Sequence, residues 1–260
     1  MKRLLCLLCL SAIALPVAAE VPVYGYEIVK RYPHNIASFT QGLEFHDGVL
    51  YEGTGRNGRS SLSKINLEDG TVLQTKKLPS RYFGEGISIV GERIYQLTWQ
   101  SNIVFVYDLA SFESVTSYYH PTEGWGLAWD GEQLILSDGS ASLQFIDPET
   151  FQVLRKVEVS LEGRPIRNLN ELEYINGEVW ANVWMTNEIV RIDPATGVIN
   201  SVVDLHGLID ETTTGDAEGV LNGIAWLPDT AAGASAGSGR LFVTGKLWAD
   251  LFEITLVPRQ

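Results

Sequence analysis

Five short segments of this chain share a framework but differ in the residues that could perform chemistry. Each segment contains a dipeptide in which Gly or Glu precedes Leu or Ile: Gly42-Leu43, Gly86-Ile87, Gly126-Leu127, Glu171-Leu172 and Gly223-Ile224. The residues directly before these dipeptides, which we call column one, are Gln41, Glu85, Trp125, Asn170 and Asn222. A purely structural repeat would tend to keep such residues alike. We therefore predict one site assembled from five copies of a strand.

A second column lies fourteen residues further along the chain. It holds Gly55, Trp99, Gly139, Trp184 and, after a ten-residue insertion in the fifth segment, Lys246. Column one begins a strand and column two follows the end of the next, antiparallel strand, so both columns should lie at the same end of the fold. The side chains expected to converge there are Gln41, Glu85, Trp99, Trp125, Asn170, Trp184 and Lys246, with Phe39 and Phe83 as further aromatic wall. For Asn222 a role in a turn or cap remains open.

The predicted pocket has aromatic walls, a few polar groups and one carboxylate, that of Glu85. This composition is typical of a small-molecule site, but it lacks the paired acids of an ordinary glycosidase. The histidines at 34, 46, 120 and 206 do not have the spacing of zinc ligands. Burial among tryptophans should raise the pKa of Glu85, which would let it transfer protons near neutral pH.

Four acids, at positions 210, 211, 216 and 218, crowd one segment of the chain. Carboxylate oxygens in such a cluster could hold Ca²⁺. The alternative, which we favour, is a solvated acidic loop. We therefore expect no cofactor and no metal.

The segments between the columns are typical of β-hairpins. Asp47-Gly48, Asp130-Gly131 and Asn176-Gly177 separate β-prone runs, and glycine readily adopts the positive φ of such turns. A third strand then ends in a polar turn, such as Asp147-Pro148, and a fourth strand closes the unit. Four strands repeated at 40 to 46 residues predict a β-propeller.

Five such units can be counted, so we predict an all-β, five-bladed β-propeller. The last unit lacks a fourth strand, whereas residues 24–31 form a strand without a unit of its own. We expect this N-terminal strand to pair with the last blade and close the ring, which would remove two exposed sheet edges.

The N-terminal nineteen residues have the pattern of a cleavable signal peptide. Lys2 and Arg3 precede an apolar run, and small residues at 17–19 suit a signal peptidase. We predict a signal peptide at 1–19, a single catalytic domain at 20–260, and a periplasmic or secreted protein. Both cysteines, Cys6 and Cys9, fall within the signal, so disulfides, thiolate metal sites and cysteine nucleophiles are excluded from the mature chain.

The charge balance limits the possible partners. The full chain carries a formal charge of −13, and loss of Lys2 and Arg3 gives 17 − 32 = −15. A surface this acidic repels phosphate backbones, so we expect no nucleic-acid partner. No later segment is apolar enough to enter a membrane, and we expect a monomer.

The motifs around the two columns resemble those of the plant-type glutaminyl-peptide cyclotransferases, which also occur in bacteria. Seven motifs follow one another in the family's order and span nearly the whole mature chain: 39–43 (FTQGL), 83–86 (FGEG), 96–99 (QLTW), 123–127 (EGWGL), 169–173 (LNELE), 181–184 (ANVW) and 244–246 (TGK). The insertion at 231–239 and the absence of cysteine from the mature chain depart from the family without affecting a motif.

The resemblance implies a zinc-independent, five-bladed propeller enzyme that converts the N-terminal glutamine of peptides or proteins to pyroglutamate and releases ammonia. It implies that Glu85 is the general acid/base. The residues that match the family's substrate pocket are Phe39, Gln41, Phe83, Trp99, Trp125, Asn170, Trp184 and Lys246.

Two other functions fit the residues less well. In a non-catalytic peptide- or sugar-binding propeller, the tryptophans would stack on the ligand and Glu85 would only accept a hydrogen bond. A metal-dependent propeller hydrolase would need ligands that the columns do not supply.

Overall fold

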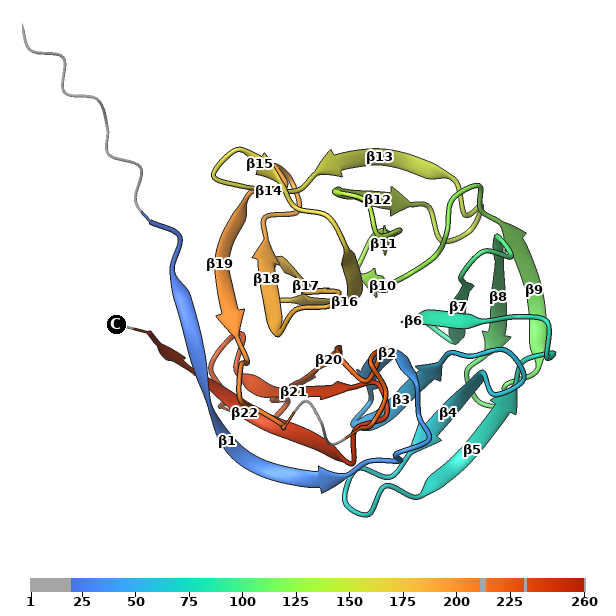
Figure 1. Ribbon diagram of the computed structural model, residues 1–260. Coiled ribbons are helices and arrows are strands. Elements are labelled where there is room, and N and C mark those ends of the chain that lie inside the picture. The colour runs from blue at the N-terminus through green and yellow to red at the C-terminus, as the bar shows by residue number, and fades with distance from the viewer. Residues whose placement is uncertain (1–19, 211–213, 232, 260) are drawn as a thin grey trace, which may run out of the picture.

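The computed structural model describes residues 20–210, 214–231 and 233–259, and this part of the chain is built from strands, turns and bends without a helix (Figure 1). The all-β prediction is confirmed. The predicted signal peptide, residues 1–19, lies outside the described residues. In the described ranges there is accordingly no helix that could span a bilayer.

Most of the strands belong to four-stranded antiparallel units that follow one another along the chain. The first unit contains β2 (Thr40–His46), β3 (Val49–Thr54), β4 (Ser61–Ile65) and β5 (Val72–Lys77). The second contains β6 (Gly84–Val90), β7 (Arg93–Thr98), β8 (Ile103–Asp108) and β9 (Ser114–Tyr119). The third contains β10 (Leu127–Trp129), β11 (Leu134–Ser137), β12 (Ser142–Ile146) and β13 (Val153–Glu158). The fourth contains β16 (Leu169–Ile175), β17 (Glu178–Val183), β18 (Glu188–Ile192) and β19 (Ile199–Asp204).

The last unit combines the two ends of the described chain. It contains β20 (Leu221–Pro228), β21 (Gly239–Gly245), β22 (Asp250–Pro258) and, as its outermost strand, β1 (Val23–Pro33). The antiparallel register of β1 with β22 runs from Tyr24 opposite Pro258 to Pro33 opposite Asp250, so the N-terminal strand pairs where the sequence predicted. β1 also makes a short parallel pairing with β19, which joins the last two units into one sheet. A small hairpin, β14 (Ser160–Leu161) and β15 (Arg164–Pro165), was not predicted.

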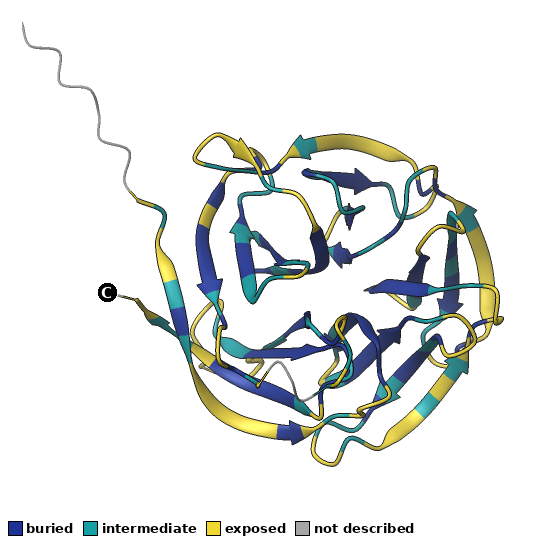
Figure 2. Cartoon of the chain, in the orientation of Figure 1, coloured by how far each residue is buried: buried dark blue, intermediate teal, exposed yellow. Residues whose placement is uncertain are grey.

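The units are arranged in a ring, with the first strand of each at the centre and the fourth at the rim (Figure 1). The innermost strands β2, β6, β10, β16 and β20 contact one another in that order, and β20 contacts β2 again. Figure 2 shows buried residues on the inner strands and exposed residues along β5, β9, β13 and β1. Inner strands such as β6 are accordingly buried on both faces, whereas β5 is largely exposed.

Hydrophobic packing between neighbouring units holds the ring together. In the described residues, five apolar clusters each draw side chains from two adjacent units. One cluster joins Leu43 of the first unit to Phe242 of the last and includes Tyr32 of β1. The N-terminal strand therefore contributes to the core as well as to the hydrogen bonding of the last unit.

The Gly-Leu/Ile dipeptides of the sequence lie where the innermost strands approach each other most closely. A Cβ at Gly42 would lie 2.5 Å from the amide nitrogen of Ile87, and one at Gly86 would lie 2.7 Å from the carbonyl oxygen of Trp125. A Cβ at Gly126 would overlap with the carbonyl of Asn170. Glycine is required because backbone meets backbone at these points.

Three buried or half-buried glutamates bridge the innermost strands through their carboxylates. The backbone N–H of Ile89 donates to Glu44 (3.0 Å), and that of Trp226 donates to Glu173 (2.9 Å). Glu171 accepts from the backbone N–H groups of Leu43 (3.1 Å) and Ile224 (2.8 Å). Burial raises the pKa of Glu44 to about 8 and raises those of Glu171 and Glu173 well above the usual range, although the backbone donors act in the opposite direction.

These raised pKa values predict that the fold loses stability as the pH rises. Between the ordinary carboxyl pKa of 4.5 and about 8, the folded protein binds a proton at Glu44 that the unfolded chain has released, so the free energy of unfolding decreases across this range. Glu44→Gln, whose carbonyl can still accept from Ile89, should remove part of this slope.

Thermal unfolding at about pH 5 and about pH 8 measures the effect. The melting temperature of the wild type should fall by at least ~2 °C more than that of Glu44→Gln, equivalent to about 1 kcal/mol in a domain of this size. Glu92→Gln, at an exposed turn between β6 and β7, is the control. Equal slopes in the wild type and Glu44→Gln would contradict the assignment.

Candidate active site

The nine side chains singled out in the sequence line one cavity of about 280 Å³. We call this cavity the funnel. Its lining consists of Phe39, Gln41, Phe83, Glu85, Trp99, Trp125, Asn170, Trp184 and Lys246, together with Glu218, which sequence analysis placed only in the acidic segment. Residues from all five units therefore meet at one place.

A repeated backbone hydrogen bond places the two columns at the same end of the ring. The N–H of a column-two residue donates to the carbonyl of the residue two positions before column one. The pairs are Gly55–Phe39 (2.8 Å), Trp99–Phe83 (3.1 Å), Trp184–Asn168 (2.8 Å) and Lys246–Val220 (2.9 Å). In the first, second and fourth units this bond accompanies the fourteen-residue spacing, and in the fifth it persists despite the insertion.

The column-one residues of four units lie at irregularities in strand pairing. The register shifts between Thr40 and Gly42 in β2, and equivalent shifts occur in β6, β16 and β20 around Glu85, Asn170 and Asn222. In the third unit Trp125 precedes β10, and its N–H donates to the carbonyl of Ser137 (3.0 Å). Bulges of this kind re-aim a side chain at the end of a strand, which accounts for the delivery of column one into the funnel.

Two groups of aromatic rings form the walls of the funnel. Phe83 lies edge-on to Phe39, with ring centroids 6.0 Å apart, and contacts Trp99 at 5.6 Å. Trp125 and Trp184 meet in a T-shaped arrangement with their centroids 5.6 Å apart. Such edge-to-face contacts fix the ring orientations.

The glycines of column two provide space for these rings. A Cβ at Gly55 would overlap with the ring of Phe83, and one at Gly139 would lie 2.6 Å from Trp125. Gly139 also has a φ of +76°, a conformation that other residues rarely adopt. Column two therefore contains three residues that supply a ring or charge and two glycines over which a neighbouring ring lies.

Glu85 is a buried acid in this apolar setting, with 4% of its surface exposed. Burial raises the pKa of Glu85 well above its usual range; the positive charge of Lys246 acts against this increase and the negative charge of Glu123 adds to it. A carboxyl group with a raised pKa can both donate and accept a proton near neutral pH.

Lys246 is also buried, and its ammonium lies 4.8 Å from the ring centroid of Phe39. Burial lowers the pKa of Lys246, while Glu85 and Glu218 oppose this decrease. The guanidinium of Arg56 lies 4.3 Å from the same ring. Phe39 thus carries two cation–π contacts at the edge of the funnel.

A buried network anchors the segment that carries Phe39 and Gln41. The carboxylate of Glu52 accepts from Ser38 (3.0 Å) and Thr40 (2.7 Å), and it pairs with His34 at 3.0 Å. Burial alone would lower the pKa of His34, but the charge of Glu52 raises it. His34 is therefore engaged in a structural ion pair.

The carboxamides of column one have different roles. Asn222 is fully buried and does not line the funnel; its side chain donates to the carbonyl of Thr40 (2.9 Å) and to Oε1 of Gln41 (3.1 Å). This contact positions Gln41 with its NH₂ group as the remaining donor. Asn170 is buried, and its Oδ1 has no hydrogen-bond partner within the described part of the chain. An unsatisfied buried acceptor on a cavity wall is available to a ligand.

The acidic segment contributes to the edge of the funnel. Asp216 pairs with Arg56 at 2.5 Å, and Glu218 lies 4.0 Å from the same guanidinium. Glu211 of this segment lies outside the described residues. No group of three His, Cys, Asp or Glu residues arranged for a metal ion occurs in the ranges that the structure describes.

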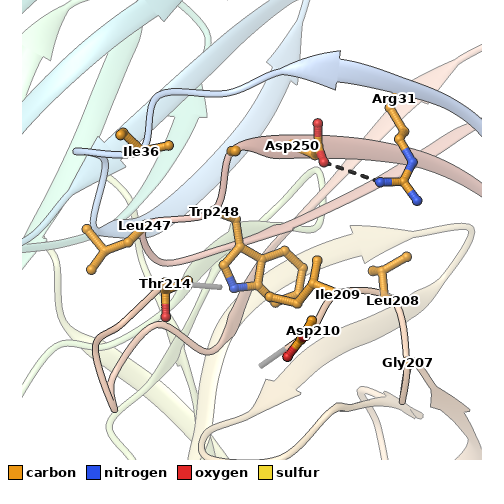
Figure 3. A pocket seen from close by; sticks show the side chains of 11 residues that line it. Arg31, Ile36, Gly207, Leu208, Ile209, Asp210, Thr214, Leu247, Trp248 and Asp250 are labelled. Atoms are coloured by element: carbon orange, nitrogen blue, oxygen red, sulfur yellow. Dashed lines mark hydrogen bonds and ion pairs between the residues drawn. The ribbon is translucent and has the colours of Figure 1, made fainter. Parts of the chain in front are cut away.

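A larger cavity, of about 440 Å³, lies outside the funnel and contains none of the predicted site residues. Figure 3 shows its wall, in which Trp248 lies below the ion pair of Arg31 with Asp250 (3.4 Å). The indole N–H of Trp248 donates to the carbonyl of Gly219 (3.0 Å). Because these polar groups already have partners in the protein, the funnel is the better candidate for chemistry.

An all-β ring with one buried acid in an aromatic funnel indicates a binding or catalytic site for a small polar group. Comparison with known proteins makes this specific. The chain belongs to the glutamine cyclotransferase family, whose model matches residues 2–256.

A glutaminyl-peptide cyclotransferase of Arabidopsis thaliana is 44% identical over 234 residues, which cover 88% of this chain and 71% of that protein. The crystal structure of Myxococcus xanthus glutaminyl cyclase superposes with a TM-score of 0.82 at 36% identity and covers 93% of this chain and 100% of that one. The resemblance seen in the sequence is thereby confirmed at the level of the family.

The contact between Gly139 and Trp125 leads to a prediction with a matched control. Gly139→Ala and Gly48→Ala both place a side chain at a φ of +76°, but Gly48 has open space around it. Both should lose about 1 kcal/mol to backbone strain. Only Gly139→Ala should also displace the Trp125 ring and alter the near-ultraviolet circular dichroism; identical spectra for the two variants would contradict this description of the wall.

Proposed function

We propose that this protein is a glutaminyl-peptide cyclotransferase that converts an N-terminal glutamine of peptides or proteins to pyroglutamate and releases ammonia. The observation that carries the proposal is the convergence of all nine motif residues on one cavity in a member of the glutamine cyclotransferase family. The names of the Arabidopsis and Myxococcus proteins support the same reaction.

The same proposal extends to the architecture. The five units would be the blades of a five-bladed β-propeller, and residues 20–260 would form one catalytic domain. The ring of contacts among the innermost strands and the apolar clusters between units support this interpretation. A closed ring holds residues from distant parts of the chain at fixed positions around one axis.

The reaction joins two groups of the same residue. The α-amine attacks the side-chain amide carbon, a C–N bond forms, and the original C–N bond of the amide breaks. The amine loses one proton and the leaving nitrogen gains one, so a single group that accepts and then donates a proton completes the balance. Folding the glutamine side chain toward its own amine is a proximity effect, and closely packed aromatic walls suit it.

In this mechanism Glu85 is the proton carrier. As a carboxylate it takes a proton from the attacking amine, and as a carboxylic acid it gives that proton to the departing ammonia. The pKa of Glu85, raised chiefly by burial, supports both steps near neutral pH. The aromatic rings can hold the substrate's cationic or neutral amine while water is excluded.

The carboxamides can orient the glutamine side chain. The NH₂ group of Gln41, whose Oε1 is engaged by Asn222, can donate to the amide oxygen on which negative charge develops. The unpartnered Oδ1 of Asn170 can accept from the substrate's amine or amide NH₂. Lys246 supplies a positive charge at the same cavity.

We further propose that the enzyme acts without a metal or other cofactor, as a monomer, outside the cytoplasm in the periplasm or as a secreted protein. Its partners would be peptides or proteins with N-terminal glutamine. It would bind neither nucleic acid nor membranes. The pairing of His34 with Glu52 and of Asp216 with Arg56, which occupies three potential ligands, supports metal independence.

Conversion of a glutamine-initiated peptide tests the function most simply. Incubation with Gln-2-naphthylamide should release ammonia and give the pyroglutamyl product. Absence of conversion for a range of glutamine-initiated peptides, with a native circular dichroism spectrum, would refute the proposal; tight binding without conversion would point to a binding protein.

Two substitutions should separate catalysis from binding. Glu85→Gln is nearly isosteric and should lower kcat by roughly two to four orders of magnitude, the contribution expected of a positioned acid/base. Trp184→Phe removes contact area and should raise KM more than it lowers kcat. Steady-state kinetics of both variants provides the check, and wild-type turnover by Glu85→Gln would refute the role of Glu85.

Metal independence predicts that chelation has little effect. Dialysis against EDTA should leave the rate within about twofold of the untreated enzyme, because loss of a catalytic metal removes far more activity than this. A large loss that zinc restores would show that the site had been misinterpreted.

A further inference from the structure

One acid beside the funnel has no role in the mechanism derived above. Glu123 is half-buried, and one of its oxygens, Oε2, accepts from the indole Nε1 of both Trp99 (2.8 Å) and Trp125 (3.0 Å). Its other oxygen accepts from Nε2 of Gln100 (3.0 Å). Glu123 does not line the funnel, whereas both indoles that it contacts do.

We propose that Glu123 is a positioning residue: its carboxylate holds the indoles of Trp99 and Trp125, from neighbouring units, in the orientation that binds the N-terminal glutamine. This inference rests on the proposed function, because it assigns a role in the same site. A single acceptor shared by two indoles also couples their orientations.

The two tryptophans depend on this contact to different degrees. Trp125 lies over Gly139 and against Trp184, so packing restricts its ring on two sides. Trp99 is 38% exposed, and Phe83 is its aromatic neighbour in the funnel. An exposed ring with few neighbours can turn over, and a charge-assisted hydrogen bond from its only N–H opposes that rotation. Trp99 should therefore respond most to loss of Glu123.

Glu123 has a distinctive position in the sequence repeat. It lies two residues before Trp125, as Phe39 lies before Gln41 and Phe83 before Glu85. The first two units thus place a wall ring at this position, and the third places an acid that holds two rings.

The charge of Glu123 also acts on the proton carrier. Partial burial acts to raise the pKa of Glu123, but hydrogen bonds from Trp125, Gln100 and Trp99 outweigh it and hold that pKa below its usual range. The resulting negative charge adds to the burial that raises the pKa of Glu85, in opposition to Lys246. Glu218 and Arg56 face Lys246 from the edge of the funnel.

Three variants separate the effects of geometry and charge. Glu123→Gln keeps a carbonyl oxygen that both indoles can reach but removes the charge. Glu123→Leu removes every acceptor at similar volume. Glu132→Leu, at an exposed position on the turn between β10 and β11, is the control for loss of a carboxylate.

Steady-state kinetics with Gln-2-naphthylamide and near-ultraviolet circular dichroism should be measured for each variant. Glu123→Leu should raise KM about tenfold or more, since it removes two charge-assisted hydrogen bonds, and should alter the tryptophan spectrum. Glu123→Gln should keep KM within about threefold and retain the spectrum, since a neutral acceptor preserves most of the geometry. Because Glu123→Gln removes a negative charge near Glu85, the acid limb of the variant's pH profile of kcat/KM should move to lower pH. Glu132→Leu should match the wild type in all three readouts.

Wild-type KM and spectrum in Glu123→Leu, while the wild type turns over normally, would overturn the proposal and leave the function intact. Equal KM increases in the Gln and Leu variants would also overturn it. If the wild type converts no substrate, the proposed function fails, and the spectral comparison alone still decides whether Glu123 orients the indoles.

Should Glu123→Leu not fold, Glu123→Asp provides the test, because it withdraws the carboxylate by one methylene. Glu123→Asp should give the same rise in KM, and wild-type kinetics and spectrum in this variant would overturn the proposal.

Discussion

The close approach of the innermost strands around the ring axis is the constraint on which the rest of this structure depends. Gly42 and Gly86 permit backbone-to-backbone contact with the next unit, and the residue before each dipeptide falls at an irregularity in strand pairing. The packing of the axis therefore turns column one toward a common cavity. The same feature that allows the innermost strands to pack closely also delivers the column-one side chains to the funnel.

The funnel combines groups whose charges adjust one another. An isolated carboxylate in an apolar cavity would be expensive to bury, and Lys246 and Glu123 act on Glu85 with opposite signs. Arg56 in turn pairs with Asp216 and lies over Phe39. The proposed chemistry would therefore depend on a set of neighbouring charges, in which Glu85 is the member that we propose exchanges a proton with the substrate.

Much of this arrangement could be predicted from the sequence, because the repeat makes its exceptions visible. The strand order, the pairing of residues 24–31 with the last unit, and the nine funnel residues follow from the two columns and the period. The roles of Glu123, Asn222 and Glu218 did not, because they act through contacts between units or come from a loop outside the repeat. Glu123 carried a detectable signal, since it occupies the position of Phe39 and Phe83 in the register. The hairpin β14–β15 and the packing of Phe83 over Gly55 and of Trp125 over Gly139 needed coordinates, because they depend on three-dimensional contacts.

Direct titration of Glu85 tests the central claim that one buried acid in an aromatic funnel carries the proton. The carboxyl band can be followed against pH by infrared difference spectroscopy of the wild type minus Glu85→Gln, which cancels the buried Glu44, Glu171 and Glu173. If Glu85 is the proton carrier, a protonated Glu85 band should persist well above the ordinary pKa of a glutamate. A Glu85 that ionises at an ordinary carboxyl pKa would contradict this role, because its carboxylate would be a weak base toward the attacking amine.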